Sequence, residues 1–362
     1  VSTHFNTGGI TTYILTLVKG FIQRGHKVIV VSSGGELVDC LQQMGGAHMK
    51  MDILTKSELD PKIYLTAFKL RKIVKEKNID VIHSHTRVTQ VLGQVLSFLT
   101  KIPYVATCHG FYKLRLSRRW WPCWGDAAIA ISPPVQKHLI KDFGVPEKKI
   151  FLVHNGIDVS RFPVPDERSR EEKRRQHGLS GHLVIGIIAR LADVKGHSVL
   201  VRALPKVLRK FSNAKLLIVG NGKEEENLRR LVQQLDLGEY VTFMSMVNRT
   251  AEILPLFDVS VLPSLDEGLG ISIMEAQIMS VPVIATNVGG IPSLVKDGQT
   301  GLLVPPNDAD ALAEAIIKVV SDKELARRLG AQAREFILKE FNSDLMVEDT
   351  LEVYRKVIDG KK

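Results

Sequence analysis

The sequence predicts an α/β protein with two doubly wound domains in tandem. Short apolar segments of strand length alternate with longer amphipathic segments along the chain, which is the pattern of βαβ units with parallel sheets. The alternation is interrupted near residue 155, and 362 residues are too many for one compact core. No apolar run approaches the roughly 20 residues that a membrane-spanning helix requires.

The first half of the chain predicts an open parallel sheet covered by helices. The opening residues, VST, look like the end of a first strand. The strands that we expect next lie at 26–32, 79–85, 102–109, 127–132 and 149–154. Helices are expected at 10–24, 61–77, 88–99 and 133–142.

A break in the pattern separates the two halves. Residues 154–165 contain an Asn-Gly turn and two prolines, and residues 166–181 mix acids and bases in the way typical of a solvated helix face. We therefore expect one domain at 1–157 and a second at 158–344. Strands of the second domain are expected at 182–190, 214–220, 240–246, 259–264, 281–286 and 301–306. The segment 308–360 is expected to be helical, and its end, about 345–362, to pack back on the first domain.

The charge balance and the cysteines limit the class of partner and the compartment. The 49 lysines and arginines outnumber the 39 aspartates and glutamates, and an isoelectric point near 9.4 suits nucleic acid, anionic lipid or phosphorylated small molecules. Three cysteines without a C-x-x-C pair disfavour a disulfide framework and a zinc cluster, and favour a reducing compartment. No signal peptide is visible, so we expect a cytoplasmic protein.

Ligands of doubly wound sheets bind beyond the carboxyl ends of the strands, and two such sheets facing each other would leave a deep cleft. Gly8 and Gly9 join the opening strand to a helix, where backbone N–H groups can bind an anion. A tight turn that needs a positive φ is the favoured alternative for a glycine pair taken alone. The G-x-G-x-x-G fingerprint of dinucleotide binding is missing here, which disfavours a nicotinamide oxidoreductase.

Two cations flank the turn after the strand at 182–190. Arg190 ends this strand, and Lys195 follows five residues later. Two neighbouring cations suit a diphosphate, whose charge lies on two adjacent phosphorus centres. A salt bridge on the rim of a loop is an equally good interpretation of either residue alone.

The segment DEGLGISIMEA (266–276) predicts a phosphate site between two acids. A helix is expected to begin near Gly270, which leaves the N–H groups of Leu269, Gly270 and Ile271 without helical partners at the positive end of the helix dipole. Glu267 and Glu275 would lie about 10 Å apart, beyond the ~5–9.5 Å of paired-carboxylate hydrolases. Carboxylates accept hydrogen bonds from sugar hydroxyls, so this layout suits a nucleotide sugar. A capped core helix with one exposed acid is the alternative.

With these motifs the chain resembles the retaining glycosyltransferases of family 4, which have the GT-B fold. The resemblance covers nearly the whole chain through GGI, GHKVIVVS, IDVIHSHT, TCHG, AIAIS, VHNGIDVSRF, IARLADVKG, LLIVGNG, EGLGISIMEA and PVIATNVGGIPSLVKDGQTGLLVPPND. It implies that the first domain binds the acceptor and the second a nucleotide-sugar donor. It also implies that Glu267 contacts the transferred sugar, Glu275 the ribose, and Arg190 with Lys195 the diphosphate.

The resemblance implies further contacts to the donor. Gly9 would approach the diphosphate, with Gly8 beside it, and His109 of TCHG would face the donor sugar. Gly222 of LLIVGNG and Val247 of FMSMV would complete the donor site. Ser245 departs from the family pattern, which often has glycine in this turn, and this leaves the contact to the base open.

The implied reaction is transfer with retention by front-face displacement, in which the departing diphosphate helps to deprotonate the acceptor. The catalytic residues would be His109, Glu267, Arg190 and Lys195, with UDP the expected nucleotide and GDP open. We expect no metal and no other cofactor. The pair His83 and His85 lacks a third ligand at a recognisable spacing, and the acidic triplet at 308–310 fits a helix cap.

The segment 111–126, FYKLRLSRRWWPCWGD, contains all three tryptophans among several basic residues. Lys113, Arg115, Arg118 and Arg119 alternate with Phe111, Tyr112, Trp120, Trp121 and Trp124. This mixture suits an anionic membrane surface, and a core-facing tryptophan cluster under a basic loop is an equally good interpretation. Nucleic acid is the weakest option, because no binding motif accompanies the patch.

A membrane surface at 111–124 would favour a lipid-linked or glycan acceptor in envelope polysaccharide or lipopolysaccharide synthesis. The protein would then be peripheral on the inner face of the membrane. Two alternative functions stay open: a non-catalytic nucleotide-sugar-binding protein, and a nucleotide-sugar epimerase of the same GT-B architecture.

Overall fold

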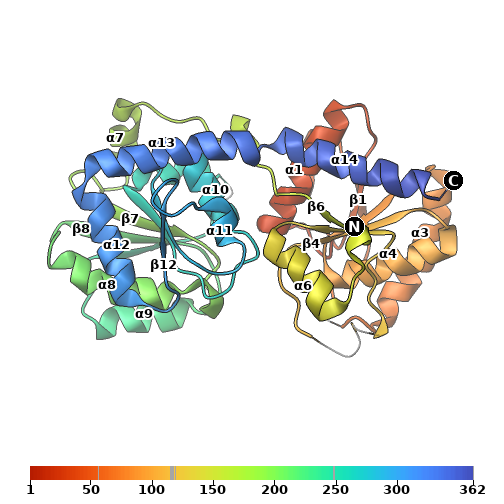
Figure 1. Cartoon of the computed structure of the whole chain (residues 1–362), viewed down its shortest axis with the longest axis horizontal. Coiled ribbons are helices and arrows are strands. Elements are labelled where there is room, and N and C mark those ends of the chain that lie inside the picture. Colours follow the sequence, from red (N-terminus) through yellow and green to blue (C-terminus); the bar gives the residue numbers. More distant parts are fainter. Residues whose placement is uncertain (56, 115–117, 119, 248, 362) are drawn as a thin grey trace. The chain divides into compact units, whose positions relative to one another are not determined.

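The structure, a computed structural model, describes every residue except Lys56, residues 115–117, Arg119, Asn248 and Lys362 (Figure 1). The chain divides into two compact units. Unit 1 contains Val1–Gly156 and Phe341–Lys362, and unit 2 contains Ile157–Glu340.

Unit 1 contains two parallel sheets that meet at the start of the chain. A four-stranded sheet has the order β3-β4-β5-β6, and β1 pairs with β2 in a second sheet. These strands are β1 Ile29–Ser32, β2 Ala47–Lys50, β3 Ile82–Ser84, β4 Tyr104–Cys108, β5 Ala127–Ala130 and β6 Ile150–Leu152. The expected strand stub, Val1 to Thr3, hydrogen-bonds to both sheets, because Ser2 N–H donates to the Val31 carbonyl at 3.0 Å and His85 N–H donates to the Val1 carbonyl at 3.2 Å. The opening residues therefore connect β1 to β3.

The helices of unit 1 bury apolar faces against these sheets. They are α1 Gly9–Gln23, α2 Val38–Gln43, α3 Pro61–Glu76, α4 Arg87–Thr100, α6 Pro133–Phe143 and α14 Ser343–Asp359. The last helix lies beside α1, blue against red in Figure 1, so the end of the chain packs on its beginning. Gly20 permits this contact, since a Cβ there would stand 2.3 Å from a methyl group of Val347.

Helix α2 and strand β2 were not predicted from the sequence. The residues of β2, AHMK, alternate in no clear hydrophobic pattern, and the strand has exposed residues at both ends because it lies at an edge of its sheet. Helix α2 buries only Leu41. Elements that bury so little apolar surface leave a weak periodic signal in the sequence.

Unit 2 contains one six-stranded parallel sheet with the order β12-β11-β10-β7-β8-β9. Its strands are β7 Leu183–Ile188, β8 Ala214–Val219, β9 Val241–Met244, β10 Val259–Leu262, β11 Val283–Thr286 and β12 Leu302–Val304. Its helices are α7 Glu167–Gln176, α8 His197–Leu208, α9 Glu225–Gln234, α10 Ile271–Ile278, α11 Ile291–Leu294, α12 Ala309–Ser321 and α13 Lys323–Glu340. Asp308 caps α12 by accepting a hydrogen bond from Ala311 N–H at 2.9 Å, which confirms the capping role predicted for the acidic triplet.

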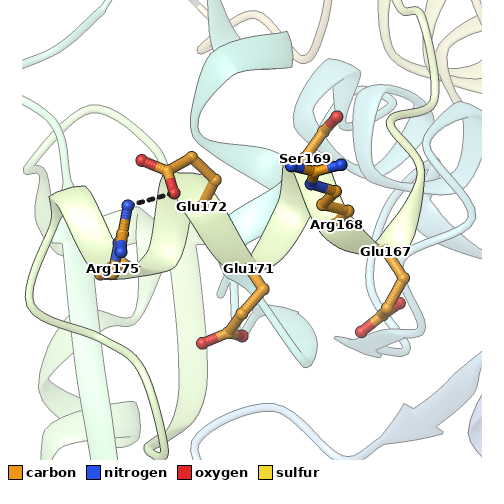
Figure 2. A pocket seen from close by; sticks show the side chains of 6 residues that line it. All are labelled: Glu167, Arg168, Ser169, Glu171, Glu172 and Arg175. Carbon is orange, nitrogen blue, oxygen red and sulfur yellow. Dashed lines mark hydrogen bonds and ion pairs between the residues drawn. The ribbon is translucent and has the colours of Figure 1, made fainter.

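The mixed-charge segment forms the surface helix α7. Arg170 and Arg174 fix it to unit 2 by binding Asp258 at 2.8 and 2.9 Å. A shallow depression of about 690 Å³ follows its outer face, lined by Glu167, Arg168, Ser169, Glu171, Glu172 and Arg175 (Figure 2). All six residues belong to one helix, and Glu172 pairs with Arg175 at 2.6 Å, so this depression is a solvated helix face.

Two further observations concern the cysteines and the membrane. Cys40, Cys108 and Cys123 are free thiols. No helix within the described part of the chain is both long and apolar enough to cross a membrane.

Candidate functional site

Three strand-to-helix loops of unit 2 join at the carboxyl ends of β7, β10 and β11. Leu265 N–H donates to the Val194 carbonyl at 2.7 Å, which ties the loop after β10 to the loop after β7. Gly290 N–H donates to the Glu267 carbonyl at 2.9 Å and brings in the loop after β11. We call the loops at 190–196, 263–270 and 287–290 the loop cluster. It contains Arg190, Lys195, Glu267, Leu269 and Gly270 of the predicted site.

Two glycines let backbone segments touch around this cluster. A Cβ at Gly290 would stand 2.0 Å from the Gly268 carbonyl oxygen, and one at Gly222 would stand 2.1 Å from the Leu191 carbonyl oxygen. Both distances are far inside van der Waals contact, so no other residue fits without a backbone shift. Packing therefore explains glycine at position 222, which the sequence analysis had placed in the donor site.

Lys195 and Glu267 are partners in the loop cluster. The Lys195 ammonium donates to the Glu267 carboxylate, and the two side chains are only 20% and 13% exposed. Ser264 Oγ lies 3.4 Å from the same carboxylate oxygen. The salt bridge that was the alternative interpretation of Lys195 is thus present. Arg190 differs, because its side chain is exposed and makes no ion pair with any residue that the structure describes.

Helix α10 begins at Ile271, as the sequence predicts. Gly270 caps it in the left-handed conformation with φ of 101°, and no side chain occupies the cap. The N–H groups of Leu269, Gly270 and Ile271 donate to no other described residue. The helix therefore directs uncompensated amides and the positive end of its dipole at the loop cluster.

Glu275 lies one helical turn into α10 and is half-buried. Burial raises the pKa of its carboxyl to about 7, although Thr250 and Arg161 act in the opposite direction. Thr250 follows β9, in the same loop as the half-buried Val247. Met246 N–H in this loop donates to Asn221 Oδ1 at 3.1 Å, which links the loops after β8 and β9. Glu275 thus lies on α10 beside the loop after β9, which is joined to the loop after β8.

The alternative interpretation of the Gly8–Gly9 turn in unit 1, that it needs a positive φ, is wrong. Gly8 has a φ of 161°, which is extended backbone open to any residue, and a Cβ there would meet nothing within 4 Å. The preceding loop is braced by Glu36, whose carboxylate accepts a hydrogen bond from Thr7 N–H at 2.7 Å. Nothing inside the folded chain therefore requires glycine at position 8.

His109 follows β4 and lies in a group of aromatic rings. The Tyr13 ring of α1 meets it edge-on, with centroids 4.7 Å apart, and His85 Nδ1 lies 3.3 Å from His109 Nε2. Burial lowers the pKa of His109 to about 3, so its imidazole is neutral. The pair considered for a metal, His83 and His85, packs ring against ring at 4.1 Å. Within the described residues, no three His, Cys, Asp or Glu side chains are placed to hold a metal ion.

The tryptophans of the segment 111–126 divide between the core and the surface. Trp124 is 7% exposed, whereas Trp120 and Trp121 are 83% and 54% exposed. The core interpretation therefore holds for Trp124, whereas the exposed Trp120 and Trp121 leave the membrane surface a prediction. Arg115 and Arg119, which the sequence analysis included in the patch, lie outside the described residues.

A buried ion triad holds the base of this surface. Glu58 binds Arg87 at 3.0 Å and Arg118 at 2.8 Å. The same Arg87 guanidinium donates to the carbonyls of Trp121 and Pro122, both at 2.7 Å. The exposed Trp121 is thus carried on a backbone that is fixed to α4.

Several residues around the predicted site were missed by the sequence analysis. Tyr13, His85 and Glu36 contact or brace predicted residues, yet Tyr13 and Glu36 were not singled out, and His85 was considered only as a metal ligand beside His83. Tyr13 had a usable signal, since it lies one helical turn after Gly9 and helix side chains lean toward the N-terminus. The partners of His85 and Glu36 depend on which loops meet in space, and the local sequence does not carry this information.

Comparison with known proteins agrees with this architecture. The family described as Glycosyltransferase Family 4 matches residues 7–161, and Glycosyl transferases group 1 matches residues 169–336. The solved structure of HepE from Anabaena in complex with UDP-glucose aligns with a TM-score of 0.86, at 20% identity over 98% of this chain and 99% of that one. The fold is therefore that of the GT-B glycosyltransferases.

Two curated relatives come from Mycolicibacterium smegmatis. Its alpha-maltose-1-phosphate synthase is 32% identical over 76% of this chain and 79% of its own length. Its GDP-mannose-dependent alpha-(1-6)-phosphatidylinositol monomannoside mannosyltransferase is 29% identical over 91% of this chain and 90% of its own length. The chain belongs to glycosyltransferase family 4, whose members transfer sugars from nucleotide sugars.

Proposed function

We propose that the protein transfers a hexose or N-acetylhexosamine, with retention and without a metal, from a nucleoside-diphosphate sugar to a lipid-linked or glycan acceptor. The observation that carries this proposal is the composition of the loop cluster. It combines an exposed arginine, uncompensated amides at the start of α10 and a carboxylate already oriented by a lysine. Such a set of groups complements a diphosphate next to a sugar hydroxyl.

We assign different tasks to the residues of the loop cluster. The amides of Leu269, Gly270 and Ile271 and the guanidinium of Arg190 bind the diphosphate. Because Glu267 already neutralises most of the charge of Lys195, Arg190 supplies the principal uncompensated positive charge. Glu267 accepts a hydrogen bond from the transferred sugar, and the ammonium of Lys195 holds that carboxylate in place.

The remaining donor contacts follow from the family resemblance. Glu275 and Val247 contact the nucleoside, Gly8 and Gly9 leave room for the diphosphate, and His109 contacts the transferred sugar. The surroundings of Gly8 support this assignment, since its backbone is extended and a Cβ there would meet nothing within 4 Å, so packing within the chain does not account for the glycine.

The reaction exchanges one bond at the anomeric carbon for another on the same face. The bond from this carbon to the diphosphate oxygen breaks, and a bond to the acceptor hydroxyl oxygen forms. The acceptor proton passes to the departing diphosphate. Arg190 and the α10 amides stabilise the negative charge that develops on the leaving group, which is electrostatic preorganisation by fixed protein groups. These groups take the place of a metal ion.

An acceptor at a membrane is supported by two observations. Trp120 and Trp121 expose large apolar surfaces on a firmly held loop with Lys113 nearby in the chain. The similar mycobacterial mannosyltransferase is named for a phosphatidylinositol mannoside. We therefore place the protein on the cytoplasmic face of a membrane, in synthesis of an envelope polysaccharide or lipopolysaccharide.

The nucleotide is tested first by thermal unfolding with UDP, GDP, UDP-glucose, UDP-N-acetylglucosamine and GDP-mannose. UDP is our first expectation because the HepE structure holds UDP-glucose, and GDP the second because the mannosyltransferase is named for GDP-mannose. A ligand at one hundred times its Kd adds about 2.7 kcal/mol to the free energy of unfolding, which a melting curve resolves. If none of these ligands raises the melting temperature, the proposed donor site is wrong.

Transfer is then tested with the stabilising sugar and a membrane extract as acceptor source. An equatorial anomeric proton in the product, as in an α-linked sugar, establishes retention from an α-linked donor, and an axial anomeric proton, as in a β-linked product, contradicts it. Activity that EDTA abolishes and a divalent ion restores would overturn the metal-free reaction. Formation of epimerised donor without acceptor would indicate the nucleotide-sugar epimerase. Binding of the donor without any turnover would indicate the non-catalytic binding protein.

A further inference from the structure

Three histidine rings form a continuous stack in unit 1. His83 and His85 have centroids 4.1 Å apart, and His85 and His109 have centroids 5.5 Å apart. Tyr13 closes the outer side by packing edge-on against both His85 and His109, at 5.6 and 4.7 Å. We call His83, His85 and His109 the histidine stack.

The inner end of the histidine stack is fixed by hydrogen bonds to both ring nitrogens of His83. Nδ1 lies 2.6 Å from the Tyr354 hydroxyl on α14, and Nε2 lies 2.7 Å from Thr107 Oγ1 on β4. A ring held at both nitrogens cannot rotate without breaking one of these bonds. His85 packs on this fixed ring and is itself only 5% exposed, so its own orientation is restricted.

The outer end of the histidine stack is the contact between His85 Nδ1 and His109 Nε2 at 3.3 Å. Burial lowers the pKa of both histidines, so both rings are neutral. A neutral imidazole has one N–H donor and one acceptor nitrogen, and the bond at one nitrogen selects the tautomer. One proton therefore lies between these two rings. Its position determines whether Nδ1, the other nitrogen of His109, is a hydrogen-bond donor or an acceptor.

We propose that His85 is a positioning residue for transfer: it holds Nε2 of His109 in the histidine stack, so that Nδ1 of His109 is the nitrogen that contacts the donor sugar. This inference rests on the proposed function, in which His109 contacts that sugar. It adds which nitrogen acts and which neighbour selects it. The hydrogen bonds of His83 to α14 and β4 fix the first ring of the histidine stack, and the packed rings thereby restrict the orientation of His109.

The nitrogen is identified by two substitutions of His109. An asparagine amide occupies the place of Nδ1, whereas a glutamine amide reaches the place of Nε2. His109→Asn should therefore retain at least tenfold more kcat than His109→Gln. If the glutamine variant is the more active one, the assignment of Nδ1 is wrong.

The positioning role is tested at His85. His85→Phe keeps a buried ring and removes the hydrogen bond, and we expect kcat to fall by about ten- to a hundredfold, as misplaced catalytic groups do, with the KM for the donor little changed. His85→Asn restores a polar group at the Nδ1 position and should recover most of this loss. The matched control is His48→Asn, which removes another partly buried histidine of unit 1, one that bonds Ser32 at 2.8 Å, and should leave kcat unchanged.

Coupling between the two residues separates positioning from general damage to the fold. In a His109→Ala background, His85→Phe should cause no further loss, because its effect passes through His109. The ¹⁵N shifts of the His109 ring should show one tautomer in the native protein and a mixture in His85→Phe. An additive loss or an unchanged tautomer contradicts the inference.

The outcomes distinguish this inference from the proposed function. Normal turnover by His109→Ala removes His109 from the proposed reaction altogether. Loss of turnover in His109→Ala together with normal turnover in His85→Phe leaves the proposed function in place and overturns the positioning role. Should His85→Phe not fold, the comparison of His109→Asn with His109→Gln still decides which nitrogen acts. A large loss of kcat in His85→Asn, whose amide keeps a polar group at the Nδ1 position, would then contradict the positioning role.

Discussion

Lys195 and Glu267 are 72 residues apart in the chain and ion-paired in the loop cluster. The family resemblance implies that Lys195 contacts the diphosphate and Glu267 the transferred sugar. In the structure, however, each side chain is the principal partner of the other. The pair therefore brings little net charge to the loop cluster. In the function that we propose, Lys195 holds the Glu267 carboxylate in one orientation, and the exposed Arg190 supplies the charge that a diphosphate needs.

Lys195→Met should lower the stability of the protein. It leaves the mostly buried Glu267 carboxylate without its cation, which costs about 1–3 kcal/mol in the free energy of unfolding. Adding Glu267→Gln removes the stranded charge and should recover much of the loss. Urea denaturation measures both variants. Lys206→Met is the control, because its partners Asp310 and Glu314 are exposed and such pairs contribute only about 0.2–1 kcal/mol. Equal losses at the two lysines would contradict a special role for the Lys195 pair.

Arg190→Ala should abolish transfer without unfolding the protein. Loss of a group that stabilises the charge on the leaving diphosphate typically costs about a hundred- to a thousandfold in kcat. The melting temperature should not change, since the Arg190 side chain is exposed and makes no ion pair in the described chain. Arg168→Ala, at an exposed arginine of α7, controls for the lost surface charge. Near-normal turnover of Arg190→Ala would remove this residue from the mechanism.

The alternation of apolar and amphipathic segments predicted parallel sheets in both halves of the chain, because strands buried on both faces are short and continuously apolar. The strand β7, LVIGII, is of this kind. The alternation predicted one sheet in the first half, where the structure describes two. The pattern failed at β2, whose AHMK residues are half-exposed at a sheet edge, and at the short helix α2. The hydrophobic pattern of an element reflects the side chains that it buries, so elements that bury few side chains were not predicted.

The residues of the candidate site were easier to predict than their partners. Gly270 was placed at the start of a helix because glycine and the following apolar run are local signals. That Lys195 meets Glu267 and that His85 meets His109 depends on which strand ends lie side by side, and this is a property of the folded sheet. Glycines were ambiguous for the same reason. Packing requires glycine at position 222 but not at position 8, and the sequence alone does not distinguish these two cases.

Gly8→Ala should weaken donor binding without destabilising the fold. The backbone at this position is extended and the space around it is open within the chain, so an alanine costs nothing in the folded state. A diphosphate that approaches the turn would meet the new methyl group. Isothermal titration should therefore show a higher Kd for the donor at an unchanged melting temperature.

Gly290→Ala is the contrasting control for Gly8→Ala. Its Cβ would overlap the Gly268 carbonyl, and such overpacking typically costs about 1–3 kcal/mol. It should therefore lower the melting temperature, which Gly8→Ala should not. Donor binding by Gly8→Ala at native affinity would exclude this turn from the site.

The pKa of Glu275 predicts a stability that depends on pH. Burial raises this pKa from its ordinary value of 4.5 to about 7, so between these pH values the folded protein retains a proton that the unfolded chain has released. The contribution of Glu275 to the free energy of unfolding therefore falls as pH rises from 4.5 to 7, and is level above 7. Chemical denaturation of the native protein and of Glu275→Gln at pH 5, 6, 7 and 8 measures this difference. Glu226→Gln, at an exposed acid of α9, should show no such trend, and a constant difference for Glu275→Gln would contradict the raised pKa.

The exposed tryptophans predict binding to anionic membranes. Burial of a large apolar side chain contributes about 1.5–3 kcal/mol, so Trp120→Ala with Trp121→Ala should reduce binding to phosphatidylglycerol vesicles by roughly tenfold or more. Flotation of the protein with vesicles measures the bound fraction, and phosphatidylcholine vesicles test the need for negative charge. Trp124→Phe is the matched control, because Trp124 is 7% exposed and packs inside unit 1, where it cannot reach a lipid surface. Equal binding to both kinds of vesicle, or unchanged binding by the double variant, would leave these tryptophans without a membrane function and make a soluble glycan the better acceptor.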